Sequence, residues 1–129
     1  MNSKFSLAAK VLFAVPMIVF GANKFLLFFN APPPEDPAAQ AFMMGMFGSY
    51  LGKLVGITEM VGGILIFIPR TSLIGLIMLL VVTVNIVLYH LAHDLPGNGI
   101  WLLTLAMAII TTISQKDQFN RLIINHNNF

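Results

Sequence analysis

Four long apolar segments constrain the fold of this chain more than any other feature of its sequence. They cover about residues 5–29, 50–68, 72–91 and 100–113. A helix needs about 20 apolar residues to cross the hydrocarbon core of a bilayer, and the first three segments come close to or exceed that length. The fourth segment is shorter, and Trp101 marks one of its interfaces. We therefore predict an all-α protein whose single domain, residues 1–129, is a four-helix transmembrane bundle.

The composition supports the same environment. Hydrophobic residues make up 57% of the chain and charged residues only 9%, too few charges to cover the surface of a small soluble domain. The sequence has no cysteine, which excludes disulfides, thiol catalysis and thiolate metal sites. It also has no basic cluster with interleaved aromatic residues, so no nucleic-acid partner is expected. The predicted partner is the lipid bilayer.

The basic residues indicate how the helices are oriented, because cytoplasmic loops are enriched in lysine and arginine. One predicted side carries Lys4, Lys10, Arg70, Lys116 and Arg121. The two loops on the other side carry Glu35, Asp36 and Asp94, with no Lys or Arg. This distribution predicts an N-in, C-in topology with residues 114–129 as a cytoplasmic tail.

The loop between the first two spans is the longest. After the turn segment "APPPEDP", the stretch "AAQAFMMGMF" is apolar but forms only about three helical turns. It is too short to cross a bilayer, so we predict a short helix along the interface. The alternative is a lid over the mouth of the bundle, with Met43, Met44 and Met46 providing adaptable packing.

Four ionisable residues of the predicted spans lie at mid-membrane or in the outer half, whereas the inner half beyond the flanking Lys10 is almost wholly aliphatic and aromatic. They are Lys24, Lys53, Glu59 and His90. A charge at the bilayer centre costs about 2.5–3.5 kcal/mol, so Glu59 should be paired. Lys53 is six residues from Glu59 on the same helix and faces elsewhere. We therefore predict that Lys24 pairs with Glu59, while Lys53 reaches the outer headgroups.

Glycines share the face of the second segment that carries this glutamate. Gly52, Gly56, Glu59 and Gly63 are spaced by four, three and four residues, and such small residues let a second helix approach closely. One interpretation is a packing face with a buried ion pair that fixes register. The other is a polar cavity open to the outer side, to which Asn23, Asn85 and His90 add polar groups. His90 could also carry a proton there.

A metal site is a further interpretation of "HLAHD". His90, His93 and Asp94 share a helical face and are residue types that bind zinc or iron. A solvated helix end explains His93 and Asp94 equally well, and we predict no metal.

Three stretches together resemble the DoxX family of small four-helix membrane proteins, over Val19 to Gly97. They are "FGANKFLLFF", "AFMMGMFGSYLGKLVGITEMVGGILIFIPR" and "LIGLIMLLVVTVNIVLYHLAHDLPG". On this basis the family's characteristic residues map onto Asn23, Lys24, Glu59, Gly62, Gly63, Asn85 and His90. The family usually has a proline in the third helix, where this chain has "LLVVTVN". That departure affects the expected position of His90.

The resemblance implies a location in a bacterial cytoplasmic membrane and an association with redox chemistry. Family members are linked to thiosulfate–quinone oxidation, to quinone or catechol resistance and to membrane oxidoreductase complexes, while distant relatives are membrane chaperones or cargo receptors. We expect a redox-associated accessory subunit, not catalytic on its own and without an intrinsic cofactor. Its outward-facing pocket would bind a quinone or small phenol through Asn23, Lys24, Glu59, Asn85 and His90.

The alternative is a non-catalytic assembly subunit, scaffold or chaperone of a membrane complex. In that case the glycines Gly52, Gly56, Gly62 and Gly63 would serve helix packing. Both hypotheses include a membrane or periplasmic protein partner, and both allow an oligomer. A small transporter is disfavoured because no inverted repeat is visible.

Overall fold

The computed structural model describes residues 3–30, 32–93 and 99–127, and all regular secondary structure in these ranges is helical. The all-α prediction is therefore confirmed. The described helices are α1 (Ser3–Leu26), α2 (Pro37–Phe47), α3 (Tyr50–Leu65), α4 (Ser72–His93), α5 (Ile100–Ser114) and α6 (Lys116–Asn127).

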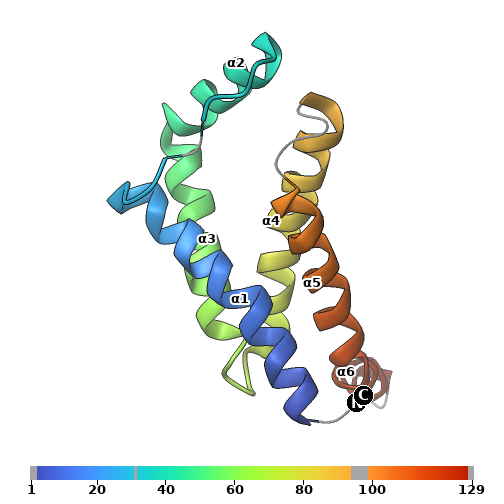
Figure 1. Cartoon of the computed structure of the whole chain (residues 1–129). Helices are drawn as coiled ribbons and strands as arrows, with labels where there is room; N and C mark the ends of the chain where they lie inside the picture. The colour runs from blue at the N-terminus through green and yellow to red at the C-terminus, as the bar shows by residue number, and fades with distance from the viewer. Residues whose placement is uncertain (1–2, 31, 94–98, 128–129) are drawn as a thin grey trace.

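Four of these helices pack side by side (Figure 1). The most extensive contacts join α1 to α3 and α3 to α4, and α5 packs against both α1 and α4. Helix α2 contacts α3 and α4 at one end of the molecule, called here the α2 end. The start of α1, the turn between α3 and α4, and α6 lie at the opposite end, called the α6 end.

Helix α1 ends at Leu26 rather than at the predicted Phe29. Leu27 has a φ of 53°, a left-handed conformation that is uncommon outside glycine and ends the helix. Its N–H still donates to the Asn23 carbonyl at 3.0 Å. The Asn23 side chain then clamps Phe29, donating to its carbonyl at 2.9 Å and accepting from its N–H at 3.0 Å. The Asn23 side chain therefore holds the chain just beyond the end of the helix.

The other helix bounds differ from the predicted ones by similar or smaller amounts, except in the tail. Helix α3 ends at Leu65 rather than Ile68, because a series of turns leads into α4. Helix α2 covers the whole of the predicted interfacial stretch and is capped by Asp36, whose side chain accepts from the Ala39 N–H at 3.1 Å. Residues 116–127, predicted only as a tail, form α6.

The core lies between α1, α4 and α5. Its buried side chains are Phe13, Ala14, Met17, Ile66, Leu76, Leu79, Val82 and Ala108. Large apolar side chains also cover the outside of α1, α3, α4 and α5 and are exposed there. Helices α1 and α4 are each long and apolar enough to cross a membrane. So much exposed apolar surface is typical of a protein that contacts lipid or other proteins.

The α6 end holds buried hydrogen bonds between neutral groups. Gln115 donates to the Ser72 hydroxyl at 2.6 Å, and Ser72 donates to the Ile66 carbonyl at 2.9 Å. Thr111 of α5 donates to the Ala9 carbonyl of α1 at 3.2 Å. Neutral groups of this kind cost less to bury than charges do, although the buried Gln115 Oε1 accepts no hydrogen bond from the described residues. They join α1, α4 and α5.

Candidate functional site: an enclosed ion pair and an aromatic cluster

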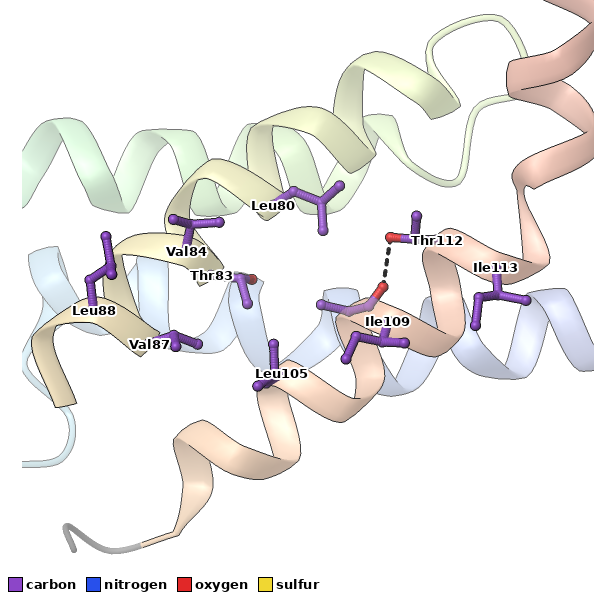
Figure 2. A pocket seen from close by; sticks show the side chains of 10 residues that line it. Leu80, Thr83, Val84, Val87, Leu88, Leu105, Ile109, Thr112 and Ile113 are labelled. Atoms are coloured by element: carbon purple, nitrogen blue, oxygen red, sulfur yellow. Dashed lines mark hydrogen bonds between the residues drawn. The ribbon is translucent and has the colours of Figure 1, made fainter. Parts of the chain in front are cut away.

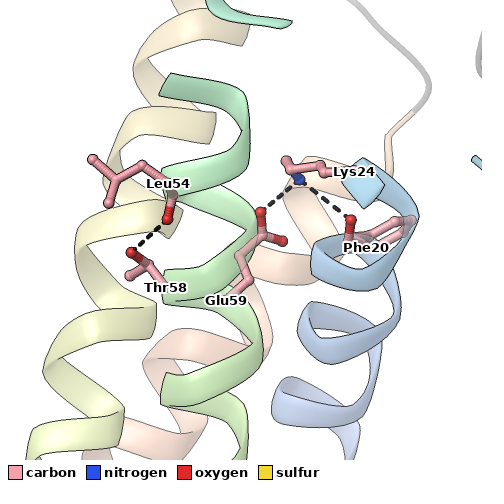
Figure 3. A network of polar contacts seen from close by, with 5 residues as sticks. All are labelled: Phe20, Lys24, Leu54, Thr58 and Glu59. Atoms are coloured by element: carbon pink, nitrogen blue, oxygen red, sulfur yellow. Dashed lines mark hydrogen bonds and ion pairs between the residues drawn. The ribbon is translucent and has the colours of Figure 1, made fainter. Parts of the chain in front are cut away.

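Lys24 of α1 and Glu59 of α3 form an ion pair, with Nζ 2.6 Å from Oε1 (Figure 3). The Glu59 side chain is only 2% exposed and that of Lys24 14%. Nζ also donates to the Phe20 carbonyl at 3.4 Å and lies 6.0 Å from the centre of the Phe47 ring. The predicted partner of Glu59 is confirmed. Lys53, the other lysine considered, is exposed.

Two glycines allow α1 and α3 to approach closely enough to form this pair. A Cβ on Gly21 would lie 2.7 Å from the Gly56 carbonyl oxygen, and a Cβ on Gly56 would lie 2.9 Å from that of Gly21. Both distances are too short for real atoms, so each backbone occupies the space that a side chain would need. The contact lies about one turn from Lys24 and from Glu59. Sequence reasoning missed Gly21, although its place three residues before Lys24 was a usable signal.

The remaining packing glycines face different neighbours. Gly63 also faces α1, where a Cβ would meet the Ile18 side chain. Gly62 faces α4, because a Cβ there would lie 3.2 Å from the Gly75 carbonyl oxygen. Gly52 faces the end of α2, at Met46 and Phe47. The four glycines predicted to serve helix packing, Gly52, Gly56, Gly62 and Gly63, are all buried. Helix α3 therefore contacts α1, α2 and α4 through residues that have no side chain.

Asn85 lies away from the ion pair. It is exposed on α4, and its amide nitrogen donates to the Val81 carbonyl of its own helix at 3.0 Å. It lines a shallow groove together with Ile77, Leu80 and Val84. Asn23, one residue before Lys24, has its side chain bonded to the backbone of Phe29.

His90 belongs to a group of stacked rings at the α2 end, the aromatic cluster. Its ring stacks on that of buried Trp101 at 5.3 Å with an interplanar angle of 13°, and Nδ1 lies 2.8 Å from the Ile86 carbonyl oxygen. Tyr89 meets His90 edge-on at 5.0 Å and stacks on Phe42 of α2 at 5.2 Å. The members are Phe42, Tyr89, His90, His93 and Trp101. The cluster joins α2, α4 and α5, and sequence reasoning did not predict it.

The proposed metal ligands cannot all be placed. His93 lies 6.0 Å from the Phe42 ring, centre to centre, whereas Asp94 is outside the described residues. Among residues 3–30, 32–93 and 99–127, no group of three or more His, Cys, Asp or Glu side chains is arranged to hold a metal ion.

A larger groove of about 400 Å³ lies between α4 and α5 (Figure 2). Leu80, Val84, Leu105 and Ile109 are among its lining residues. Two threonines also line it, but their hydroxyls donate to carbonyls of their own helices: Thr83 to Leu79 at 2.8 Å and Thr112 to Ala108 at 2.7 Å. The groove therefore offers an apolar surface, suited to hydrocarbon rather than to a polar head.

No protein-family model, curated protein or solved structure matches this chain. Membership of the DoxX family thus stays a prediction from the sequence, and the function has to be argued from the residues of the chain itself.

Proposed function

We propose that the chain is a multi-pass protein of a bacterial inner membrane, with α1, α3, α4 and α5 as a four-helix transmembrane bundle. The exposed apolar side chains of all four helices support this placement. Helices α3 and α5 are shorter than a typical span, and local thinning of the bilayer can accommodate them. Helices α2 and α6 then lie at opposite interfaces.

The distribution of charge supports an N-in, C-in orientation of this bundle. Lys4, Arg70, Lys116 and Arg121 belong to the elements at the α6 end, which would face the cytoplasm. The described acidic residues of the loop before α2, Glu35 and Asp36, belong to the opposite end. Exposed Lys53 departs from the pattern, and its long side chain can reach the headgroups.

Within that membrane, the function best supported is that of a non-catalytic accessory or assembly subunit of a membrane complex. The observation that carries this proposal is the enclosed Lys24–Glu59 pair. Each charge is matched by the other across α1 and α3, and Glu59 is almost inaccessible. An ion pair of this kind fixes the register of two helices. The apolar grooves on α4 then provide contact surface rather than a reaction site.

The test is purification of the tagged protein from native membranes in polymer-bounded lipid discs, followed by mass spectrometry. We expect one membrane protein to co-purify in a fixed ratio. The same ratio should be found with the double variant Lys24→Met/Glu59→Leu, which removes the charges but retains apolar volume. A wild-type protein recovered with no partner would contradict the proposal. So would loss of the partner in the double variant together with a small molecule found only in wild type.

A second candidate is a quinone or small-phenol site at the aromatic cluster, in a redox-associated subunit without an intrinsic cofactor. The observation that favours it is the stacking of rings from three helices at one end of the molecule. Flat rings stack well on aromatic side chains, and Tyr89 and His90 carry groups that can hydrogen-bond to a quinone oxygen. Phe42 connects α2 to this cluster, so α2 would cover the bound ring.

Trp101 is the sole tryptophan of the chain, and its fluorescence therefore reports on this cluster directly. A short-tailed quinone titrated into the purified protein should quench Trp101 saturably, and a competing phenol should reverse the quenching. His90→Ala and Phe42→Ala should weaken binding, whereas Ile64→Ala on the exposed side of α3 should not. Quenching that rises linearly, or that is equal in all variants, would rule out this candidate.

A further inference from the structure

We propose that the exposed face of α4 around Asn85 is a two-fold interface with a second copy of this chain. The proposal rests on the membrane placement above but not on either candidate function. It starts from one polar side chain in an otherwise apolar surface.

Asn85 retains unused hydrogen-bonding capacity. Its amide nitrogen donates to the Val81 carbonyl at 3.0 Å, and none of the residues that the structure describes donates to its carbonyl oxygen. Thirteen residues into α4, it lies about 20 Å from the start of the helix and about 12 Å from its end, within the hydrocarbon of a spanning helix. Lipid tails offer no hydrogen bond there, and an unpaired amide in hydrocarbon is costly.

The surroundings of Asn85 suit helix packing. Ile77, Val81, Val84 and Leu88 are spaced by four, three and four residues and are between 50 and 57% exposed. This spacing produces one stripe along a helix, of the kind that interlocks with a facing helix. A shallow groove of about 300 Å³, lined by residues of the stripe and by Asn85, runs beside it and can receive side chains from a partner.

A second copy is the occupant that satisfies both features together. An amide is both donor and acceptor, so two Asn85 side chains facing each other across a two-fold axis satisfy each other reciprocally. The apolar stripes on either side would pack against themselves in the same arrangement. An acyl chain could fill the groove but would leave the amide unpaired. Polar side chains that hydrogen-bond across spans are an established cause of association between membrane helices.

Single cysteines test this interface cleanly because the chain has no cysteine of its own. Val84→Cys places a thiol on the stripe, and Ile57→Cys places one at a comparable depth on the exposed side of α3. The two native side chains are 56% and 47% exposed. Under oxidation with copper–phenanthroline in native membranes, we expect a disulfide-linked homodimer several-fold more abundant for Val84→Cys. Equal yields, or a cross-linked product of another mass, would overturn the proposal.

Asn85 itself is tested by energy transfer between labelled copies in liposomes at several protein-to-lipid ratios. Asn85→Leu should raise the dimer dissociation constant about 3- to 30-fold, the range expected for a lost hydrogen bond between spans. Asn85→Gln, which retains an amide, should stay nearer to wild type. An unchanged constant in Asn85→Leu would contradict the proposal.

Extraction of the membranes with alkali tests the membrane placement separately from the interface. Release of the wild-type protein would reject the membrane placement itself. A protein that stays in the membrane but gives no Val84→Cys homodimer would reject the interface alone.

Discussion

The two ends of the molecule hold their helices together by different means. Toward the α2 end, α1 and α3 are joined by opposite charges 2.6 Å apart, beside a contact of backbone on backbone. At the α6 end, α1, α4 and α5 are joined by neutral hydroxyl and amide groups. A buried charge that loses its oppositely charged partner is left largely uncompensated, because the protein interior does not replace the lost solvation. Neutral hydrogen bonds can be lost one at a time at modest cost.

The largest effect should come from removing one charge of the pair. Lys24→Met leaves the Glu59 carboxylate enclosed without its partner, and we expect the free energy of unfolding to fall by about 3–5 kcal/mol. The measurement is steric-trapping unfolding in bicelles. As a matched control, Lys53→Met at an exposed position should change stability by no more than about 0.5 kcal/mol.

The double variant Lys24→Met/Glu59→Leu sharpens this prediction. It removes both charges and retains apolar volume, so it should recover most of the stability that Lys24→Met loses. If the double variant were as unstable as the single one, an unmatched charge would not be the cause of the loss.

An intermediate effect is expected from closing the space between α1 and α3. In Gly56→Ala the new methyl would meet the Gly21 carbonyl oxygen at 2.9 Å. We expect a loss of about 1–3 kcal/mol, typical of overpacking at a tight contact. Gly45→Ala on α2 is the control, because a Cβ there meets nothing within 4 Å. Alanine favours a helix over glycine by about 0.5–1 kcal/mol, so the two variants should change stability in opposite directions. The same sign in both would contradict the tight approach of α1 and α3.

The smallest effect should come from removing a neutral hydrogen bond at the α6 end. Thr111→Val retains the shape of the side chain but removes its hydrogen bond to the Ala9 carbonyl, and we expect a loss of about 0.5–1.5 kcal/mol. Thr58→Val is the matched control, since Thr58 donates only within its own helix, to the Leu54 carbonyl. Its effect should be smaller in the same unfolding measurement. A loss at Thr111 as large as that of Lys24→Met would remove the contrast between the two ends.

Much of the arrangement at the ion pair could be predicted from spacing along the chain. Helical periodicity places Gly56, Glu59 and Gly63 on one face and turns Lys53 away from it, which leaves Lys24 as the predicted partner of Glu59. Asn85 and His90 were grouped with this pair because they lie at similar depths. Depth carries no information about rotation around a helix axis, and the structure places Asn85 on an exposed face and His90 against Trp101.

The sequence by itself determined an all-helical chain, the apolar segments, and the need of one buried carboxylate for one cation. Only the tertiary structure decided which helix faces meet. The Thr111–Ala9 hydrogen bond, for example, joins residues 102 positions apart in the chain. The physical reason is that local periodicity is a property of one helix, whereas its neighbour depends on how all the helices fill the space between them.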